Sequence, residues 1–161
     1  MTGHRPADRC RETAWAAVTA GQRALVRPPE GRAQRTALAA YMAFRERHYE
    51  PYLQYAALRI GGSAAAEAAV IAAFTELAVS WTAILGGAGP AAVAWRILHD
   101  HVDRALGCGP TAVPASQIVQ TLQYDARFLH EQMHLSPDRI AEVLGIRPAD
   151  LPSLPARSPQ E

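Results

Sequence analysis

The sequence lacks lysine altogether, and its cysteines and aromatic residues are few. All sixteen basic residues are arginine and fifteen residues are acidic, so the formal net charge is only +1. Two cysteines in 161 residues do not build a disulfide framework, and aromatic residues make up only 7% of the chain. A nearly neutral chain is neither a strongly basic nucleic-acid coat protein nor a polyacidic tail. Disulfide-rich and all-β folds are therefore disfavoured.

The residues that are abundant favour a globular helical protein. Hydrophobic residues make up 49% of the chain and charged residues 19%, and alanine, a strong helix former, is the commonest residue. The length fits one domain or two small ones. No apolar segment follows residues 1–11, so we expect no secretory signal and a cytoplasmic protein. Residues 68–95 are long enough to span a bilayer, but Glu76 and the glycines at 86–89 argue against a span.

Apolar residues recur at helical spacing throughout, and no strand pattern is visible. Helices are predicted at about 15–25, 35–60, 63–85, 90–106, 117–133 and 137–144, with a Gly/Pro-rich linker at 107–116. Pro51 should kink or restart the second helix, and Ser63 and Ser136 are candidate N-caps. Gly145 should end the last helix.

Four segments occur in the order typical of one bacterial protein family. They are Phe44–Gly62, Ala66–Leu77 (AEAAVIAAFTEL), Ala94–Arg104 (AWRILHDHVDR) and Leu135–Ile146 (LSPDRIAEVLGI). The last is similar to the family's "LS..EIAE.LGIS" helix–turn–helix. Together they resemble a small RNA polymerase sigma factor of the extracytoplasmic-function type, which contains little more than regions two and four.

The resemblance implies an all-α protein with two small helical lobes. It places a region-two-like domain at 35–106 and a linker at 107–116. A region-four-like helix–turn–helix domain follows at 117–156, and 157–161 form a tail. Charge and apolar spacing predict a basic helical extension at 1–34, which is unusual for the family. The implied function is transcription initiation or regulation. Core RNA polymerase and promoter DNA are the implied partners, and an anti-sigma or other protein is a further candidate partner. We expect no enzymatic activity, no cofactor and no membrane association.

The resemblance also assigns candidate binding residues. Those implied for the polymerase are Glu67, Thr75 and Glu76. Those implied for the promoter −10 region are Trp95, Arg96, His99 and Arg104. Ser136, Arg139 and Arg147 would contact the upstream element.

Departures from the family pattern favour a second hypothesis. Most of the polar residues that the family uses to dock on a polymerase coiled coil are absent from 66–77, where alanine and isoleucine could bind another partner or pack against the N-terminal helix. Pro152 and Pro155 should prevent a full recognition helix after Gly145. Residues 105–161 also hold four arginines against six acidic residues, which disfavours phosphate contacts. The alternative is a degenerate sigma-like module that binds protein without sequence-specific DNA binding.

A third hypothesis comes from His130-Glu131-Gln132-Met133-His134, which matches the zinc-protease motif H-E-x-x-H. On a helix, His130 and His134 would share one face and bind a zinc ion, and the glutamate would activate a water. A third ligand would have to come from Asp138, Glu142 or Asp150, none at a diagnostic spacing. A zinc metallopeptidase is therefore the less favoured alternative, and we expect no metal.

Overall fold

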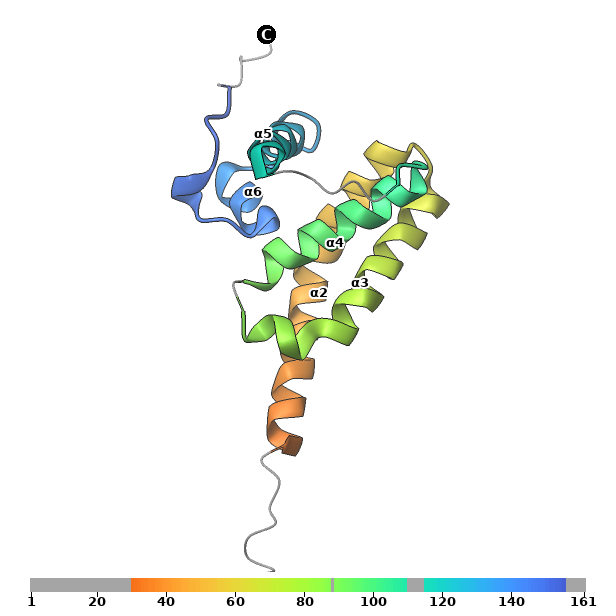
Figure 1. Ribbon diagram of the computed structural model, residues 1–161, viewed down its shortest axis with the longest axis vertical. Coiled ribbons are helices and arrows are strands. Elements are labelled where there is room, and N and C mark those ends of the chain that lie inside the picture. Colours follow the sequence, from red (N-terminus) through yellow and green to blue (C-terminus); the bar gives the residue numbers. More distant parts are fainter. Residues whose placement is uncertain (1–29, 88, 110–114, 156–161) are drawn as a thin grey trace, which may run out of the picture. The chain divides into compact units, whose positions relative to one another are not determined.

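The computed structural model describes residues 30–87, 89–109 and 115–155 (Figure 1). Within these ranges it contains five α-helices, one short 3-10 turn and no strand, so the expected all-α class is confirmed. The chain divides into two compact units, Met1–Thr36 and Ala37–Glu161. The helix expected at 15–25 lies outside the described residues, as does most of the extension expected at 1–34.

The helix boundaries follow the glycines and prolines of the sequence. The elements are α2 (Glu30–Ile60), α3 (Ser63–Leu85), α4 (Pro90–Ala105), α5 (Ala115–Glu131), α6 (Pro137–Leu144) and the 3-10 turn η1 (Pro148–Asp150). Proline in the first turn starts α4 and α6, where its missing N–H has no helical partner to lose. The expectation that Ser63 caps α3 is wrong, because extended Gly62 takes that position without a side-chain hydrogen bond.

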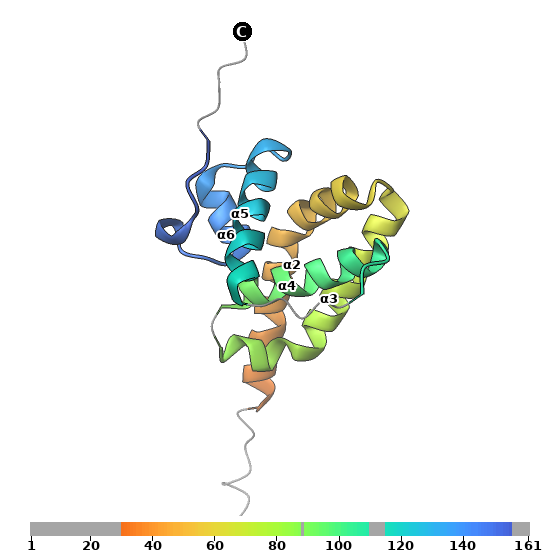
Figure 2. The ribbon, with the colours of Figure 1, turned by 45° about the horizontal axis from the view of Figure 1, so that its top comes forward.

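α2 continues through Pro51 as one helix and does not restart there. Figure 2 shows its axis changing direction between the orange and the yellow halves, as expected of a helix kinked by an internal proline. The first half of α2, from Ala37 onward, packs on α3. The Tyr41 hydroxyl donates to the Phe74 carbonyl at 2.9 Å, and the Trp81 indole donates to the Ala37 carbonyl at 2.8 Å.

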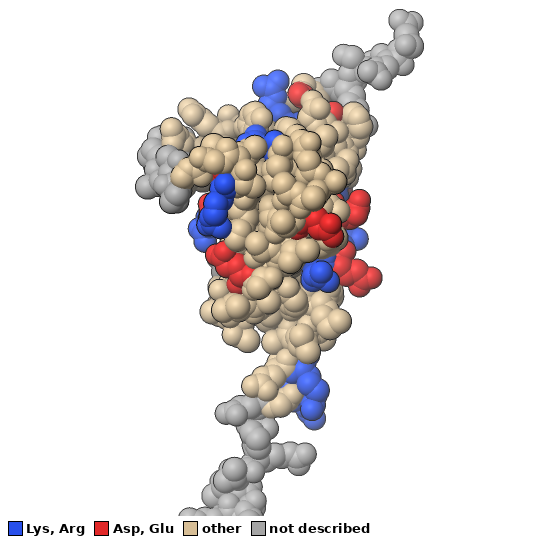
Figure 3. Space-filling model, turned by 90° about the vertical axis from the view of Figure 1, so that its right-hand side faces the viewer, with Lys and Arg blue, Asp and Glu red and all other residues tan. Residues whose placement is uncertain are grey.

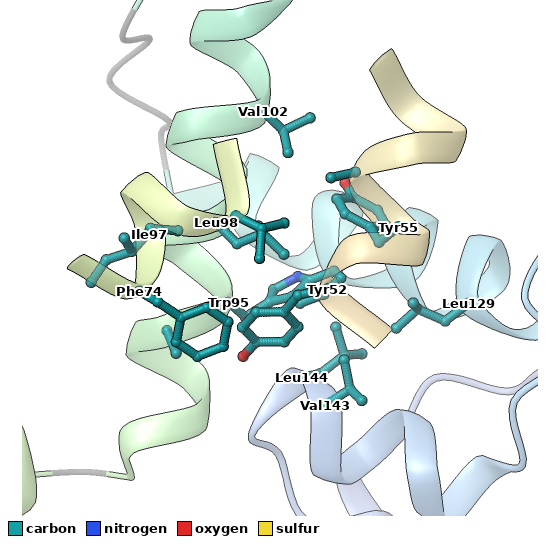
Figure 4. Close-up of a cluster of buried hydrophobic side chains, with 14 of the residues drawn as sticks. Tyr52, Tyr55, Phe74, Trp95, Ile97, Leu98, Val102, Leu129, Val143 and Leu144 are labelled. Carbon is teal, nitrogen blue, oxygen red and sulfur yellow. The ribbon is translucent and has the colours of Figure 1, made fainter. Parts of the chain in front are cut away.

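One hydrophobic core joins all five helices (Figure 4). Tyr52 of α2 stacks on Phe74 of α3 with ring centroids 5.5 Å apart, and it meets Trp95 of α4 edge-on at 5.7 Å. Leu129 of α5 and Leu144 of α6 belong to the same buried cluster. The segments predicted as separate lobes, 35–106 and 117–156, therefore share a core.

The end of α6 lies directly against the start of α4. Gly145 has a left-handed backbone with φ +69°, and a Cβ atom there would lie 2.1 Å from the backbone nitrogen of Ala92. Only glycine fits such a conformation and such an approach. This contact fixes the position of the end of α6 relative to α4.

Candidate functional site

The first half of the predicted helix–turn–helix forms as expected. The Ser136 side chain caps α6 by accepting a hydrogen bond from the Arg139 backbone N–H at 3.4 Å. At the other end, the N–H of Gly145 bonds to the Glu142 carbonyl and the N–H of Ile146 bonds to the Ala141 carbonyl. This pair of bonds is a Schellman motif, so Gly145 ends the helix as predicted.

No recognition helix follows Gly145 within residues 146–155, the part of the C-terminal segment that the structure describes. η1 is a single turn of three residues, and Leu151–Pro155 contains no helical residue. The expectation that Pro152 and Pro155 prevent a full recognition helix is therefore confirmed. Leu151 and Leu154 pack against the core from this non-helical segment. The described chain thus has no second helix here to enter a major groove.

The two arginines implied for upstream DNA are both paired within the protein. Arg147 makes two hydrogen bonds to Asp150 at 2.7 and 3.1 Å, and these lower the pKa of the Asp150 carboxyl. Arg139 Nη1 lies 2.6 Å from Glu142 Oε2. Arg147 is exposed on the turn, whereas Arg139 is largely covered. A phosphate would have to compete with these carboxylates for either side chain.

Arg139 also supplies a hydrogen bond that Pro51 removes. The carbonyl of Arg47 would normally accept from the N–H of residue 51, and proline has none. Arg139 Nη2 donates to that carbonyl at 2.5 Å. Arg47 in turn donates two hydrogen bonds to the Glu142 carboxylate, at 2.6 and 2.9 Å, and these are the main reason why the pKa of Glu142 falls to about 2. These bonds join α2 to α6.

Two of the residues implied for the −10 region form a buried polar cluster instead. Trp95 is 6% exposed, and its indole N–H donates to Asp125 Oδ2 at 2.9 Å. His99 Nε2 lies 2.9 Å from the same oxygen and 2.9 Å from the Tyr55 hydroxyl. Any contact of His99 with the −10 region would therefore have to break its pairing with a buried carboxylate. In this arrangement Trp95 offers no face for stacking on a base.

Arg96 and Arg104 remain on the surface of α4. Arg96 is exposed and has no partner among the described residues. Arg104 Nη1 lies 3.0 Å from His101 Nδ1, and His101 Nε2 lies 2.8 Å from Glu76 of α3. These two arginines are the only exposed cations among the candidates on this helix.

α3 presents an exposed stripe in which two of the four residues are apolar. Glu67, Ile71, Thr75 and Val79 recur every four residues and so share one face of the helix. All four are exposed, Val79 at 84% and Ile71 at 49%. We call these four residues the α3 stripe. Figure 3, which looks onto the side where α3 lies in Figure 1, shows a mostly uncharged surface with acidic and basic side chains spread over it.

The structure separates the three residues implied for polymerase binding. Glu67 and Thr75 lie on the α3 stripe, and Thr75 bonds only to the Ile71 carbonyl of its own helix. Glu76 is not part of the α3 stripe and pairs with His101 of α4. Glu67 is exposed and has no partner among the described residues. It is the free carboxylate of this surface.

Among the described residues, α3 is the one helix long and apolar enough to cross a membrane by length and composition. Core helices of soluble proteins pass the same test, and here Val70, Phe74, Leu77 and Trp81 pack into the core. The length of α3 is thus weak evidence for a span, and cytoplasmic localisation stays a prediction.

The H-E-x-x-H motif does not lie on one helix. α5 ends at Glu131, and His134 has a left-handed backbone with φ 56° beyond the helix end. The helical geometry expected for His130 and His134 is therefore wrong. No group of three or more potential ligands is placed to hold a metal within the ranges that the structure describes. Of the candidate third ligands, Glu142 and Asp150 are bound to arginine.

Sequence reasoning missed two residues on which this arrangement depends. Asp125 is 2% exposed and accepts from Trp95, although it looks like a surface residue of α5. Its position between Leu122 and Leu129, on the apolar face of the helix, was the available signal. Arg47 gave no such signal, because its partner Glu142 is distant in sequence.

Comparisons with known proteins identify no relative. No family model, no curated protein and no solved structure matches the chain.

Proposed function

We propose that the protein acts by protein–protein contact through the α3 stripe, with bacterial core RNA polymerase as its partner, and without sequence-specific DNA recognition by its C-terminal helices. The observation that carries the proposal is the exposure of Ile71 and Val79 beside the unpaired carboxylate of Glu67. Exposed apolar residues gathered on one helix face are typical of binding surfaces.

The choice of polymerase rests on the sequence resemblance. The α3 stripe begins within Ala66–Leu77, the segment that in sigma factors docks on the core enzyme. Its departures from the family change the chemistry of the contact, because apolar side chains replace most of the polar ones. Binding would then depend more on buried apolar area and less on salt than in a charged interface.

The proposal leaves out upstream promoter recognition for three reasons. The described chain has no recognition helix, Arg139 bonds to Glu142 and the Arg47 carbonyl, and Arg147 bonds to Asp150. Specific recognition of a base pair needs side chains free to reach base edges in the major groove. Any contact of α4 with DNA would depend on Arg96 and Arg104.

A competition pull-down tests the choice of partner. Immobilised full-length chain should retain purified core RNA polymerase, and an excess of principal sigma factor should displace it. Failure to retain the polymerase, or retention that the competitor leaves unchanged, would contradict the proposal. In the second case the chain would bind the polymerase at a site that sigma factors do not use.

A further inference from the structure

A groove of about 830 Å³ runs along α5 on a surface that the proposed function does not use. One side is α5 from Gln120 to Glu131 together with Gln132 just beyond its end, and the other side is formed by Pro152 and Ser153. At 1.5 Å per helical residue the helical side of the groove is about 17 Å long. Such a shape suits an extended ligand better than a compact one.

The lining offers amide groups beside aromatic rings. Gln120, Gln123 and Gln132 are exposed, and none of their side chains bonds to another described residue. Tyr124 is 53% exposed, with its ring 6.3 Å from that of Phe128. Free amides can both donate to and accept from a peptide backbone, and aromatic rings pack against proline.

The C-terminal segment of the chain forms the wall of the groove that faces α5. Residues 151–155 have the sequence Leu-Pro-Ser-Leu-Pro, and Leu151 has φ −66° and ψ 128°, close to the polyproline II conformation. Pro152 and Ser153 of this segment form a wall of the groove. One wall of the groove is thus a proline-containing segment, and the opposite wall carries the glutamines and aromatic rings of the α5 side.

The charges of the groove disfavour nucleic acid. Its one arginine, Arg127, lies 3.7 Å from Glu131, which also lines the groove. A phosphate backbone would meet a carboxylate and a cation that is already paired, whereas binding of single strands needs a positively charged channel. A peptide without net charge meets no such penalty.

We propose that the groove between α5 and Pro152–Ser153 binds a proline-rich peptide segment of a partner protein in the polyproline II conformation. The peptide backbone hydrogen-bonds to the glutamine amides, and its prolines pack on Tyr124. About six residues span the groove at 3.1 Å per residue. The groove is separate from the α3 stripe, so a negative result for peptide binding in the groove would leave the proposal for the α3 stripe untouched, and the reverse also holds.

The test uses the full chain and a fluorescein-labelled decapeptide of two Leu-Pro-Ser-Leu-Pro repeats, followed by fluorescence polarisation. A Gly-Ser decapeptide and labelled oligodeoxythymidine serve as comparison probes. Gln123→Ala and Tyr124→Ala should each weaken binding of the decapeptide about fivefold, the loss of roughly one net hydrogen bond or ring contact. Gln54→Ala makes the same change at an exposed site on α2 and should leave binding unaltered.

Saturable binding that is confined to the proline-rich probe and weakened by both groove variants would support the proposal. Three results would overturn the proposal. The Gly-Ser peptide could bind equally well, or the chain could prefer oligodeoxythymidine. Binding of the decapeptide could also fail to saturate at a protein concentration of about 1 mM, which is on the order of the weakest specific affinities. Unchanged affinity of Gln123→Ala for the decapeptide would also overturn the proposal. The Gln123 side chain is exposed and makes no contact on which folding depends, so this variant tests the groove alone.

Discussion

At position 145 the backbone of α6 approaches that of α4 more closely than any side chain permits. A Cβ atom there would lie 2.1 Å from Ala92 N and 2.7 Å from the carbonyl carbon of Ala91, and φ is +69°. Gly145→Ala should therefore lower the free energy of unfolding by about 3 kcal/mol, from backbone strain and overpacking together. Urea unfolding followed by circular dichroism measures the loss.

Gly62→Ala is the matched control for this substitution. Gly62 has φ −144°, and an added Cβ would meet no atom within 4 Å. Its effect on stability should stay below about 1 kcal/mol. Equal losses at the two positions would contradict the close approach of α6 to α4.

His48 gives stability a pH dependence. It is 5% exposed, and Arg139 and Glu142 face it from α6. Burial lowers the pKa of His48 in the folded protein, so the unfolded chain binds a proton more readily. Its contribution to stability is thus complete above the ordinary histidine pKa and is lost as the pH falls through the lower folded-state value.

Melting temperatures between pH 7.5 and 5 check this sign. The wild type should lose more stability on acidification than His48→Gln, which removes the titrating group while keeping a polar side chain. The other histidines contribute equally to both proteins, so the difference belongs to His48. Parallel pH profiles would show that His48 is not the responsible group.

At the scale of the elements, local signals predicted α6 better than α5. Ser136, Pro137 and Gly145 act through their own backbone, so the sequence alone locates both ends of α6. α5 was expected to continue to about residue 133, but it ends at Glu131 and the chain turns at His134. Apolar spacing could not reveal this end, because buried Met133 keeps the helical pattern beyond it.

The kink of α2 and the position of α6 should be energetically coupled. Arg139→Met leaves the Arg47 carbonyl without its donor and should cost about 2 kcal/mol. Pro51→Ala restores a backbone N–H that can serve this carbonyl. A double-mutant cycle should therefore give a coupling of about 1 kcal/mol. Additive effects within about 0.4 kcal/mol would mean that Arg139 does not replace the missing bond.

At the scale of the molecule, the sequence predicted an all-helical protein and most helix boundaries, but not how the helices combine. The Gly/Pro-rich linker at 107–116 suggested two lobes, whereas the residues that join them, such as Asp125 and Trp95, are distant in sequence. The same holds for the candidate site. The resemblance assigned Glu67, Thr75 and Glu76 to one partner, and only the three-dimensional contacts show that Glu76 and His99 are paired.

The shared core predicts one cooperative unfolding transition. Tryptophan fluorescence and circular dichroism should give coincident curves, because α2–α4 and α5–α6 bury the same cluster. Asp125→Ala should shift both curves together by about 3 kcal/mol, since it leaves the Trp95 N–H and His99 without their buried partner. Asp125→Asn keeps an acceptor and should cost less. Two separate transitions would contradict a common core.

The central claim is that the α3 stripe is the surface that binds the polymerase. The most direct measurement is the affinity of core RNA polymerase for the wild type, Val79→Glu and Val119→Glu. Val79 is 84% exposed on α3 and Val119 is 58% exposed on α5, so neither change disturbs the core. Val79→Glu should weaken binding about tenfold or more, because a carboxylate would be buried unpaired at the interface, and Val119→Glu should not. Equal affinities for all three proteins would show that the α3 stripe is not the surface that binds the polymerase.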